Sequence, residues 1–158
     1  MEKVLFVCTA NICRSPMAAG LFDALVEDRG LTFQAQSAGT AALVGKPAAL
    51  YTHQVANELE LDFDGHRARQ VDETMIRDAD LVLTMTPQHR ETLRRNFEDS
   101  KEKIYTLPEY SVGDPLGGIA DPYGHSIGTY RASAQEILHH VELVVERLER
   151  ERDGKEVG

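Results

Sequence analysis

A cysteine and an arginine, Cys8 and Arg14, lie near the start of the chain in the segment Cys8-Thr9-Ala10-Asn11-Ile12-Cys13-Arg14-Ser15. A thiolate is a strong nucleophile, and the planar guanidinium of arginine binds two phosphate oxygens at once. A loop of this length can curl and bring both side chains to one anion, where a thiolate facing a clamped phosphoryl group is placed for attack. The pair therefore indicates phosphoryl chemistry, although a small buried cysteine and a surface arginine would have the same spacing.

The flanking sequence predicts how these side chains are held. The almost wholly apolar run from Lys3 to Cys8 is typical of a strand that is covered on both faces of a parallel sheet. Ser15 and Pro16 then favour a helix start, with Ser15 as the N-cap and Pro16 at the first helical position. Ligands bind beyond the carboxyl ends of strands in such sheets, and a helix start offers free N–H groups. We therefore expect an anion-binding loop in which the amides and Arg14 favour the Cys8 thiolate.

Strands and helices alternate along the rest of the chain. Further strands are expected over 32–38, 81–83 and 104–107, and helices from Ser15 to Arg29 and over 47–59, 71–77, 87–97 and 130–148. This order predicts the α/β class with a mostly parallel sheet, in one domain over 1–158 whose end frays from about residue 150. The segment Pro108 to Gly128, with three Pro and five Gly, is expected to be a long functional loop.

Composition narrows the class of protein further. The 158 residues carry 17 Lys and Arg against 26 Asp and Glu, a formal charge of −9, which disfavours nucleic acid and anionic membranes as general partners. The two cysteines are too few for a disulfide scaffold, and no Cys/His cluster has zinc spacing. No apolar run approaches the ~20 residues of a membrane span, and Val4 to Val7 is too short for a signal-peptide core. A cytoplasmic protein without membrane insertion is expected.

Several motifs together resemble the low-molecular-weight protein-tyrosine-phosphatase family, in particular its bacterial members. The segment Val-Cys-Thr-Ala-Asn-Ile-Cys-Arg-Ser-Pro-Met-Ala at 7–18 resembles the phosphate-loop signature of that family, and the likeness continues in order at 37–39, 66–70, 79–85 and 121–124. The resemblance implies a four-stranded parallel sheet flanked by helices on both faces, and hydrolysis through a phosphocysteine. It implies a phosphorylated protein as substrate, inorganic phosphate as product and no metal or organic cofactor. A monomer is expected.

The resemblance also implies roles for individual residues. Cys8 matches the nucleophile, Arg14 the phosphate clamp and Asp121 the general acid, and a positioned acid typically contributes about 10²–10⁴-fold. Asp121 lies in the Gly/Pro-rich segment, which can bring it over the phosphate loop, although an Asp before Pro is also a common turn former. The supporting residues are those of the loop (Thr9, Ala10, Asn11, Ile12, Cys13, Ser15) and, behind it, Ser37 and His66. The five other histidines show no pattern, and His139 and His140 are expected on a helix surface.

Cys13 occupies the second cysteine position of the family. It implies a reversible Cys8–Cys13 disulfide that protects the nucleophile when it is oxidised. The alternative is a small residue at a helix start without a redox role.

Three residues bear on the substrate, namely Ile12, Leu43 and Tyr123, which are expected to wall the pocket. An apolar Ile12 and an aromatic wall suit a flat aryl ring, and relatives that hydrolyse phosphoarginine tend to carry Thr at the position of Ile12. Phosphotyrosine is therefore favoured and phosphoarginine is the alternative. Two features support that alternative: residues 105–121 look like bacterial members, and Leu43 replaces the bulky aromatic of many tyrosine phosphatases.

Other functional classes fit the sequence less well. An arsenate reductase of this fold relays electrons through a later cysteine pair, and this chain has no cysteine after Cys13. A non-catalytic phosphate-binding module would be expected to lack Cys8 or Asp121. A nucleotide hydrolase would need a G-x-x-x-x-G-K-[ST] segment, which the sequence does not contain.

Overall fold

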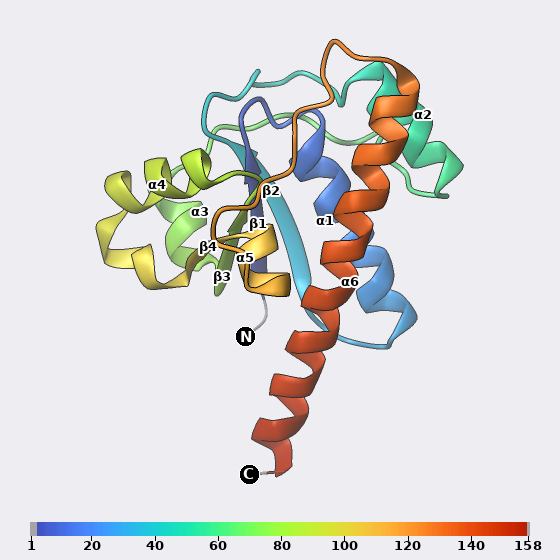
Figure 1. Ribbon diagram of the computed structural model, residues 1–158. Helices are drawn as coiled ribbons and strands as arrows, with labels where there is room; N and C mark the ends of the chain where they lie inside the picture. The colour runs from blue at the N-terminus through green and yellow to red at the C-terminus, as the bar shows by residue number, and fades with distance from the viewer. Residues whose placement is uncertain (1–2, 158) are drawn as a thin grey trace.

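A four-stranded, all-parallel sheet forms the centre of the protein in the computed structural model, which describes residues 3–157 (Figure 1). Its strands are β1 (Lys3–Cys8), β2 (Gln34–Gly39), β3 (Leu81–Thr84) and β4 (Ile104–Thr106), in the order β2-β1-β3-β4. All residues of β3 and nearly all of β1 are buried, as the apolar runs predict for strands covered on both faces. The predicted α/β class and parallel sheet are confirmed.

Helices cover both faces of the sheet, as Figure 1 shows. The side chains of β1 therefore alternate between two helical layers. Val4 and Phe6 pack toward one core, whereas Leu5 and Val7 pack toward the other. The first layer contains α1 (Arg14–Asp28), α2 (Leu50–Glu58), α5 (Leu107–Val112) and α6 (Ile127–Val157). The second layer contains α3 (Glu73–Asp78) and α4 (Pro87–Asn96), and a 3-10 turn, η1 (Glu98–Lys103), follows α4.

The strand order places a switch point between β1 and β3. The chain leaves β1 through α1 to reach β2 on one side, and β3 and β4 are then added on the other side of β1. The connections after β1 and β3 therefore diverge at the carboxyl edge of the sheet. A crevice at this position is the usual ligand site of an open α/β sheet, and the Cys8–Arg14 loop lies there.

The helix starts differ from the sequence-based expectations at two places near this edge. Ser15 is not the N-cap of the first helix: α1 begins at Arg14, and its N-cap, Cys13, makes no side-chain capping bond. The Ser15 hydroxyl bonds to side chains of the loop instead. The second helix begins at Leu50 rather than at Pro47. Local propensity could not reveal either shift, because both segments are drawn into contacts with the phosphate loop.

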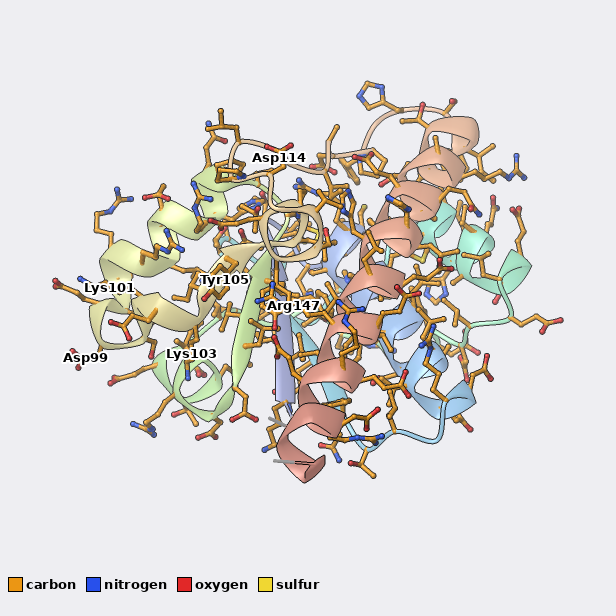
Figure 2. The ribbon with its side chains drawn as sticks, turned by 60° about the horizontal axis from the view of Figure 1, so that its bottom comes forward. Asp99, Lys101, Lys103, Tyr105, Asp114 and Arg147 are labelled. Carbon is orange, nitrogen blue, oxygen red and sulfur yellow. The ribbon has the colours of Figure 1, made fainter. Side chains whose placement is uncertain are left out.

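The segment from Pro108 to Gly128 is not loop throughout, because it begins inside α5. Thr106 and Glu109 form a reciprocal capping box at the start of this helix, and Pro108 occupies its first turn. Tyr110 of α5 packs between two side chains. Its ring centroid lies 5.4 Å from that of Tyr105 in β4, and the Arg147 guanidinium of α6 lies 3.8 Å from the Tyr110 ring centroid. Figure 2 shows Tyr105 and Arg147 on neighbouring elements near α5. The loop between α5 and α6 thus begins at Gly113, directly after a helix that is held in place by its neighbours.

The last helix, α6, runs past the sheet as far as Val157 (Figure 1). The expected fraying from about residue 150 falls within this helix. Charged pairs lie along its outer part, including the i,i+4 pair Arg147–Glu151 at 3.1 Å. Within residues 3–157, no helix combines the length and the apolar character that a membrane span requires.

Candidate active site

The loop after β1 turns its carbonyl groups outward. Four of these carbonyls accept hydrogen bonds from amides of the segment 40–49, at 2.9–3.1 Å: Cys8 from Thr40, Thr9 from Ala41, Ala10 from Leu43 and Ile12 from Ala49. In a trans peptide the N–H group points away from the C=O group of the same plane. The amides that follow these carbonyls are therefore turned toward the inside of the loop, where they form a cradle for an anion.

Asn11 is the centre of the network that holds this shape. Its φ of 61° is left-handed, which asparagine tolerates better than most residues. Its side-chain amide donates to Ser15 Oγ at 2.8 Å and Ser37 Oγ at 3.0 Å, and its Oδ1 accepts from the backbone N–H of Arg69. His66 Nε2 donates to the Asn11 carbonyl at 2.8 Å. The structure thus brings together Asn11, Ser15, Ser37 and His66, and burial lowers the pKa of His66.

Gly39, at the end of β2, is required by the closeness of the loop. A Cβ atom at this position would lie 2.3 Å from the Thr9 carbonyl oxygen, which is backbone and cannot move aside. Any side chain here would displace the loop, so Gly39 belongs to the construction of the site.

Cys8 lies at the floor of the loop and is buried. Its Sγ is 2.9 Å from Ser15 Oγ, which is also the acceptor for the Asn11 amide. Because that amide occupies an acceptor position of the Ser15 oxygen, the hydroxyl proton has two acceptors in reach, the Cys8 sulfur at 2.9 Å and the Ala38 carbonyl at 3.4 Å. The hydroxyl that local sequence assigned to helix capping thus lies beside the Cys8 sulfur, which is the nearer of its two acceptors.

Arg14 is buried beside the loop with part of its guanidinium unsatisfied. One terminal nitrogen donates to the Ile119 carbonyl at 2.8 Å, and the other lies 3.6 Å from Asp121 Oδ2. Its Nε has no hydrogen-bond partner among the described residues. A buried N–H without an acceptor is costly, and a bound oxyanion would satisfy it. The guanidinium is thus oriented for a ligand that carries several oxygens.

Asp121 approaches the loop from the segment between α5 and α6. Ile119, two residues earlier, is buried and anchors this segment by donating to the Met85 carbonyl at 2.7 Å and accepting from Arg14. Asp121 itself is 51% exposed, and its Oδ1 accepts from the Tyr123 amide. Its carboxyl group lies at the mouth of the site, within reach of both a ligand and water.

These residues line a pocket of about 140 Å³. Its walls are Cys8 to Arg14, Leu43, Asp121 and Tyr123. Leu43 and Tyr123 are 48% and 62% exposed and form the rim. Ile12, the third residue expected to wall the pocket, also lines it but is only 7% exposed.

Cys13 lines the same pocket but turns its thiol toward the helices. Its Sγ donates to Tyr130 Oη of α6 at 3.8 Å, and burial raises the pKa of this thiol above its ordinary value. Cys13 therefore remains protonated at neutral pH, and the two cysteines of the pocket differ in their surroundings.

Peroxide treatment is expected to produce a Cys8–Cys13 disulfide that dithiothreitol reverses. Peroxide converts the Cys8 thiolate to a sulfenic acid, which the Cys13 thiol attacks with release of water. Mass spectrometry of peptides after alkylation of free thiols measures the bond. Activity of the Cys13→Ser variant should be lost irreversibly under the same treatment. Irreversible oxidation of Cys8 in the wild type, with Cys13 still free, would contradict this prediction.

His89 was missed by the sequence analysis, which found no pattern in it. The ring of His89, in the first turn of α4, bonds to Thr9 of the loop at 2.8 Å. Thr86-Pro87-Gln88-His89 begins two residues after the end of β3, which is parallel to β1 and ends at the same edge of the sheet. That placement was the signal available in the sequence. Among the side chains that the structure describes, those of residues 3–154, no group of three or more His, Cys, Asp or Glu could hold a metal ion.

The arrangement combines a strand-end cysteine, an amide-lined loop and a buried arginine at the switch point of a parallel sheet. This fold and site define a cysteine-dependent phosphatase. The sequence profile described as low molecular weight phosphotyrosine protein phosphatase matches residues 3–154, and the chain belongs to that family. It is therefore a hydrolase whose substrates are phosphorylated proteins and whose product is inorganic phosphate.

Some relatives of this chain are named arginine phosphatases and others tyrosine phosphatases. The chain is 34% identical over 149 residues to a protein-arginine-phosphatase of Bacillus subtilis, covering 94% of this chain and 98% of the relative. It is 36% identical over 131 residues to the low molecular weight protein-tyrosine-phosphatase Wzb of Escherichia coli, covering 83% and 84%. Among solved structures, a YwlE arginine phosphatase mutant with a phosphorylated active-site serine is similar with a TM-score of 0.92, 32% identity and coverage of 96% and 99%.

Proposed function

We propose that the protein hydrolyses phosphotyrosine in proteins, with Cys8 as nucleophile, Arg14 as phosphate clamp and Asp121 as general acid and base. The observation that carries this proposal is the convergence of these three side chains on one pocket. The inward-facing amides supply the donors for the equatorial oxygens of the phosphoryl group. No metal or organic cofactor is needed for this chemistry, because the three side chains and the amides supply every role.

In the first step the thiolate of Cys8 donates an electron pair to phosphorus, and an S–P bond forms. The P–O bond to the leaving oxygen breaks on the opposite side, and Asp121 gives its proton to that oxygen. Arg14 and the amides bind the phosphoryl oxygens and stabilise charge that develops in the transition state. A solved relative whose active-site serine is phosphorylated supports a covalent phosphoryl intermediate in this mechanism.

In the second step a water molecule attacks phosphorus, the S–P bond breaks and inorganic phosphate leaves. The Asp121 carboxylate accepts the proton from water, which its place at the exposed mouth of the pocket permits. The sulfur departs as a thiolate, and the Ser15 hydroxyl at 2.9 Å donates to it. The network around Asn11 keeps that hydroxyl in place.

The pocket walls favour an aryl phosphate. A cavity of roughly 150 Å³ lined by apolar side chains is large enough for a benzene ring, and this pocket measures about 140 Å³. Ile12 presents apolar surface beside the phosphate site, and the exposed Tyr123 can pack against a ring. A guanidinium would leave its remaining N–H groups without a polar partner on Ile12, which disfavours it.

Phosphoarginine is the second candidate. The relative from Bacillus subtilis that is named a protein-arginine-phosphatase covers nearly the full length of both chains, and Asp121 at the pocket mouth offers a carboxylate to a guanidinium. Ile12 would contact an aryl ring in phosphotyrosine and a guanidinium in phosphoarginine. A substitution at this one position can therefore discriminate between the two activities.

Replacing Ile12 with Thr is expected to lower kcat/KM on phosphotyrosine peptides roughly tenfold and to raise it on phosphoarginine peptides. Apolar contacts in a binding pocket discriminate by about 1–3 kcal/mol, and a hydroxyl adds a polar partner for the guanidinium. The measurement is phosphate release from paired peptides of one sequence. Val44→Thr makes a similar change at an exposed position outside the pocket and should alter neither rate. A wild-type preference for phosphoarginine would overturn the tyrosine assignment.

We further propose that residues 1–158 act as one phosphatase domain, that the protein is a monomer, and that it works in the cytoplasm. The two cores on either side of one sheet support a single domain. The net charge of −9 supports a protein that stays free of nucleic acid and anionic membranes. Size-exclusion chromatography with light scattering tests the monomer.

A further inference from the structure

The imidazole of His89 is bonded at both ring nitrogens. Its Nε2 lies 2.8 Å from Thr9 Oγ1, and its Nδ1 lies 3.0 Å from Thr86 Oγ1. Thr86 is the N-cap of α4 and also accepts the backbone N–H of His89. The ring therefore connects the start of α4 with Thr9, the residue after Cys8. These two segments lie on opposite sides of the switch point.

The ring is neutral at the pH of the cytoplasm. His89 is 8% exposed, and burial and then the charge of Arg14 lower its pKa to about 4, against the opposing effect of Asp121. A neutral imidazole has one donor and one acceptor, so each nitrogen matches one of the two hydroxyl groups. His89 therefore adds no charge beside Arg14 and does not act as a general acid or base near pH 7.

The turn from β3 to α4, which carries His89, is fixed by several hydrogen bonds. The Met85 amide donates to the Val7 carbonyl of β1 at 3.0 Å, and the Met85 carbonyl accepts from Ile119 at 2.7 Å. Thr84 Oγ1 donates to the Thr86 carbonyl at 2.9 Å. The turn from β3 to α4 is thus tied to the strand that carries Cys8 and to the segment that carries Asp121.

Thr9, in contrast, has little support of its own. It is exposed, and its carbonyl is tied to Ala41 on the side of the loop next to β2. The bond to His89 holds Thr9 from the opposite side, next to β3. The peptide groups on either side of Thr9 lie between these two attachments, and their amides are among those turned into the cradle.

We infer that His89 is a positioning residue for the phosphate loop, which acts by holding Thr9 so that the adjacent amides point at the bound phosphoryl group. This inference rests on the proposed phosphate chemistry at Cys8 and adds a residue to it. His89 need not touch the substrate, and its effect passes entirely through the hydroxyl of Thr9. Its loss should therefore weaken phosphate binding and turnover while the fold is retained.

Two substitutions separate the two ends of the ring. In His89→Gln the side-chain amide can occupy the place of Nε2 and keep the bond to Thr9. In His89→Asn it can occupy the place of Nδ1, which keeps the bond to Thr86 only. We expect His89→Asn to lower kcat/KM on p-nitrophenyl phosphate about tenfold, mainly through kcat, whereas His89→Gln loses less than threefold. If His89 served only to cap α4, His89→Gln should lose more activity than His89→Asn.

A second readout is independent of turnover. We expect iodoacetamide to alkylate Cys8 and inorganic phosphate in the loop to slow this reaction. His89→Asn should require about tenfold more phosphate for half protection, whereas His89→Gln should stay near the wild-type value. If wild-type protein binds phosphate but turns over no aryl phosphate, the proposed function fails, and the protection assay still decides the role of His89.

Controls come from a second histidine and from Thr9. His140 makes a comparable bond, with Nδ1 2.6 Å from Ser111 Oγ, away from the pocket, and its Asn and Gln variants should change neither readout. Thr9→Val should reproduce the His89→Asn loss, and the double variant should lose no more, because both changes remove one bond. Additive losses, equal behaviour of His89→Asn and His89→Gln, or wild-type protection in His89→Asn would each overturn the inference.

Discussion

Cys8→Ser is expected to lower kcat on an aryl phosphate by roughly 10⁴-fold or more, the scale seen when an enzyme loses its nucleophile. Serine has nearly the same shape as cysteine, so the contact with Ser15 and the buried position at the end of β1 should persist. Its hydroxyl, however, stays protonated at neutral pH and attacks phosphorus far more slowly than a thiolate. Phosphate release over time measures the loss.

The same variant should still bind phosphate, because Arg14 and the loop amides are unchanged. Inorganic phosphate is therefore expected to raise the Tm of Cys8→Ser and of the wild type to a similar extent. Cys13→Ser makes the same atomic change at a thiol that donates to Tyr130 instead of lining the floor, and it should lose far less activity. Turnover by Cys8→Ser close to the wild-type rate would exclude the covalent mechanism.

Asp121→Asn is expected to slow turnover by about 10²–10⁴-fold for substrates with poor leaving groups. The asparagine oxygen can still accept the Tyr123 amide, so the turn that places residue 121 is kept. It has no carboxylic proton to give to the leaving oxygen. Phenols of low pKa leave without that proton, so the loss should shrink steadily across a series of aryl phosphates.

Asp114→Asn is the matched control, because Asp114 lies in the same segment and accepts the Leu116 amide through its own Oδ1 at 3.1 Å. Figure 2 shows it at the other end of this segment, near α5, and it does not line the pocket. Its substitution should leave every rate in the series unchanged. A loss at Asp121→Asn that is the same for all leaving groups would argue against proton donation.

Much of the architecture was predictable from local pattern. The apolar runs Lys3–Cys8 and Leu81–Val82–Leu83 read correctly as buried parallel strands, because burial on both faces removes polar residues. The helix beginning at Pro87 and the presence of a last helix over 130–148 followed from propensity and periodicity. Residues 108–112 were wrongly predicted as loop, because the cap that starts α5 is made by two side chains, Thr106 and Glu109, acting together.

At the site, sequence alone determined the type of chemistry. Cys8, Arg14 and the amides between them specify a nucleophile and an anion cradle, since their spacing is set by the covalent chain. Tertiary structure alone decided which distant groups complete it. The Ser15 hydroxyl lies beside the Cys8 sulfur and does not cap the helix. His89 reached Thr9 across 80 residues, because β1 and β3 are neighbours in the sheet. Such pairings depend on strand order, which is a property of the whole fold and has no local signature.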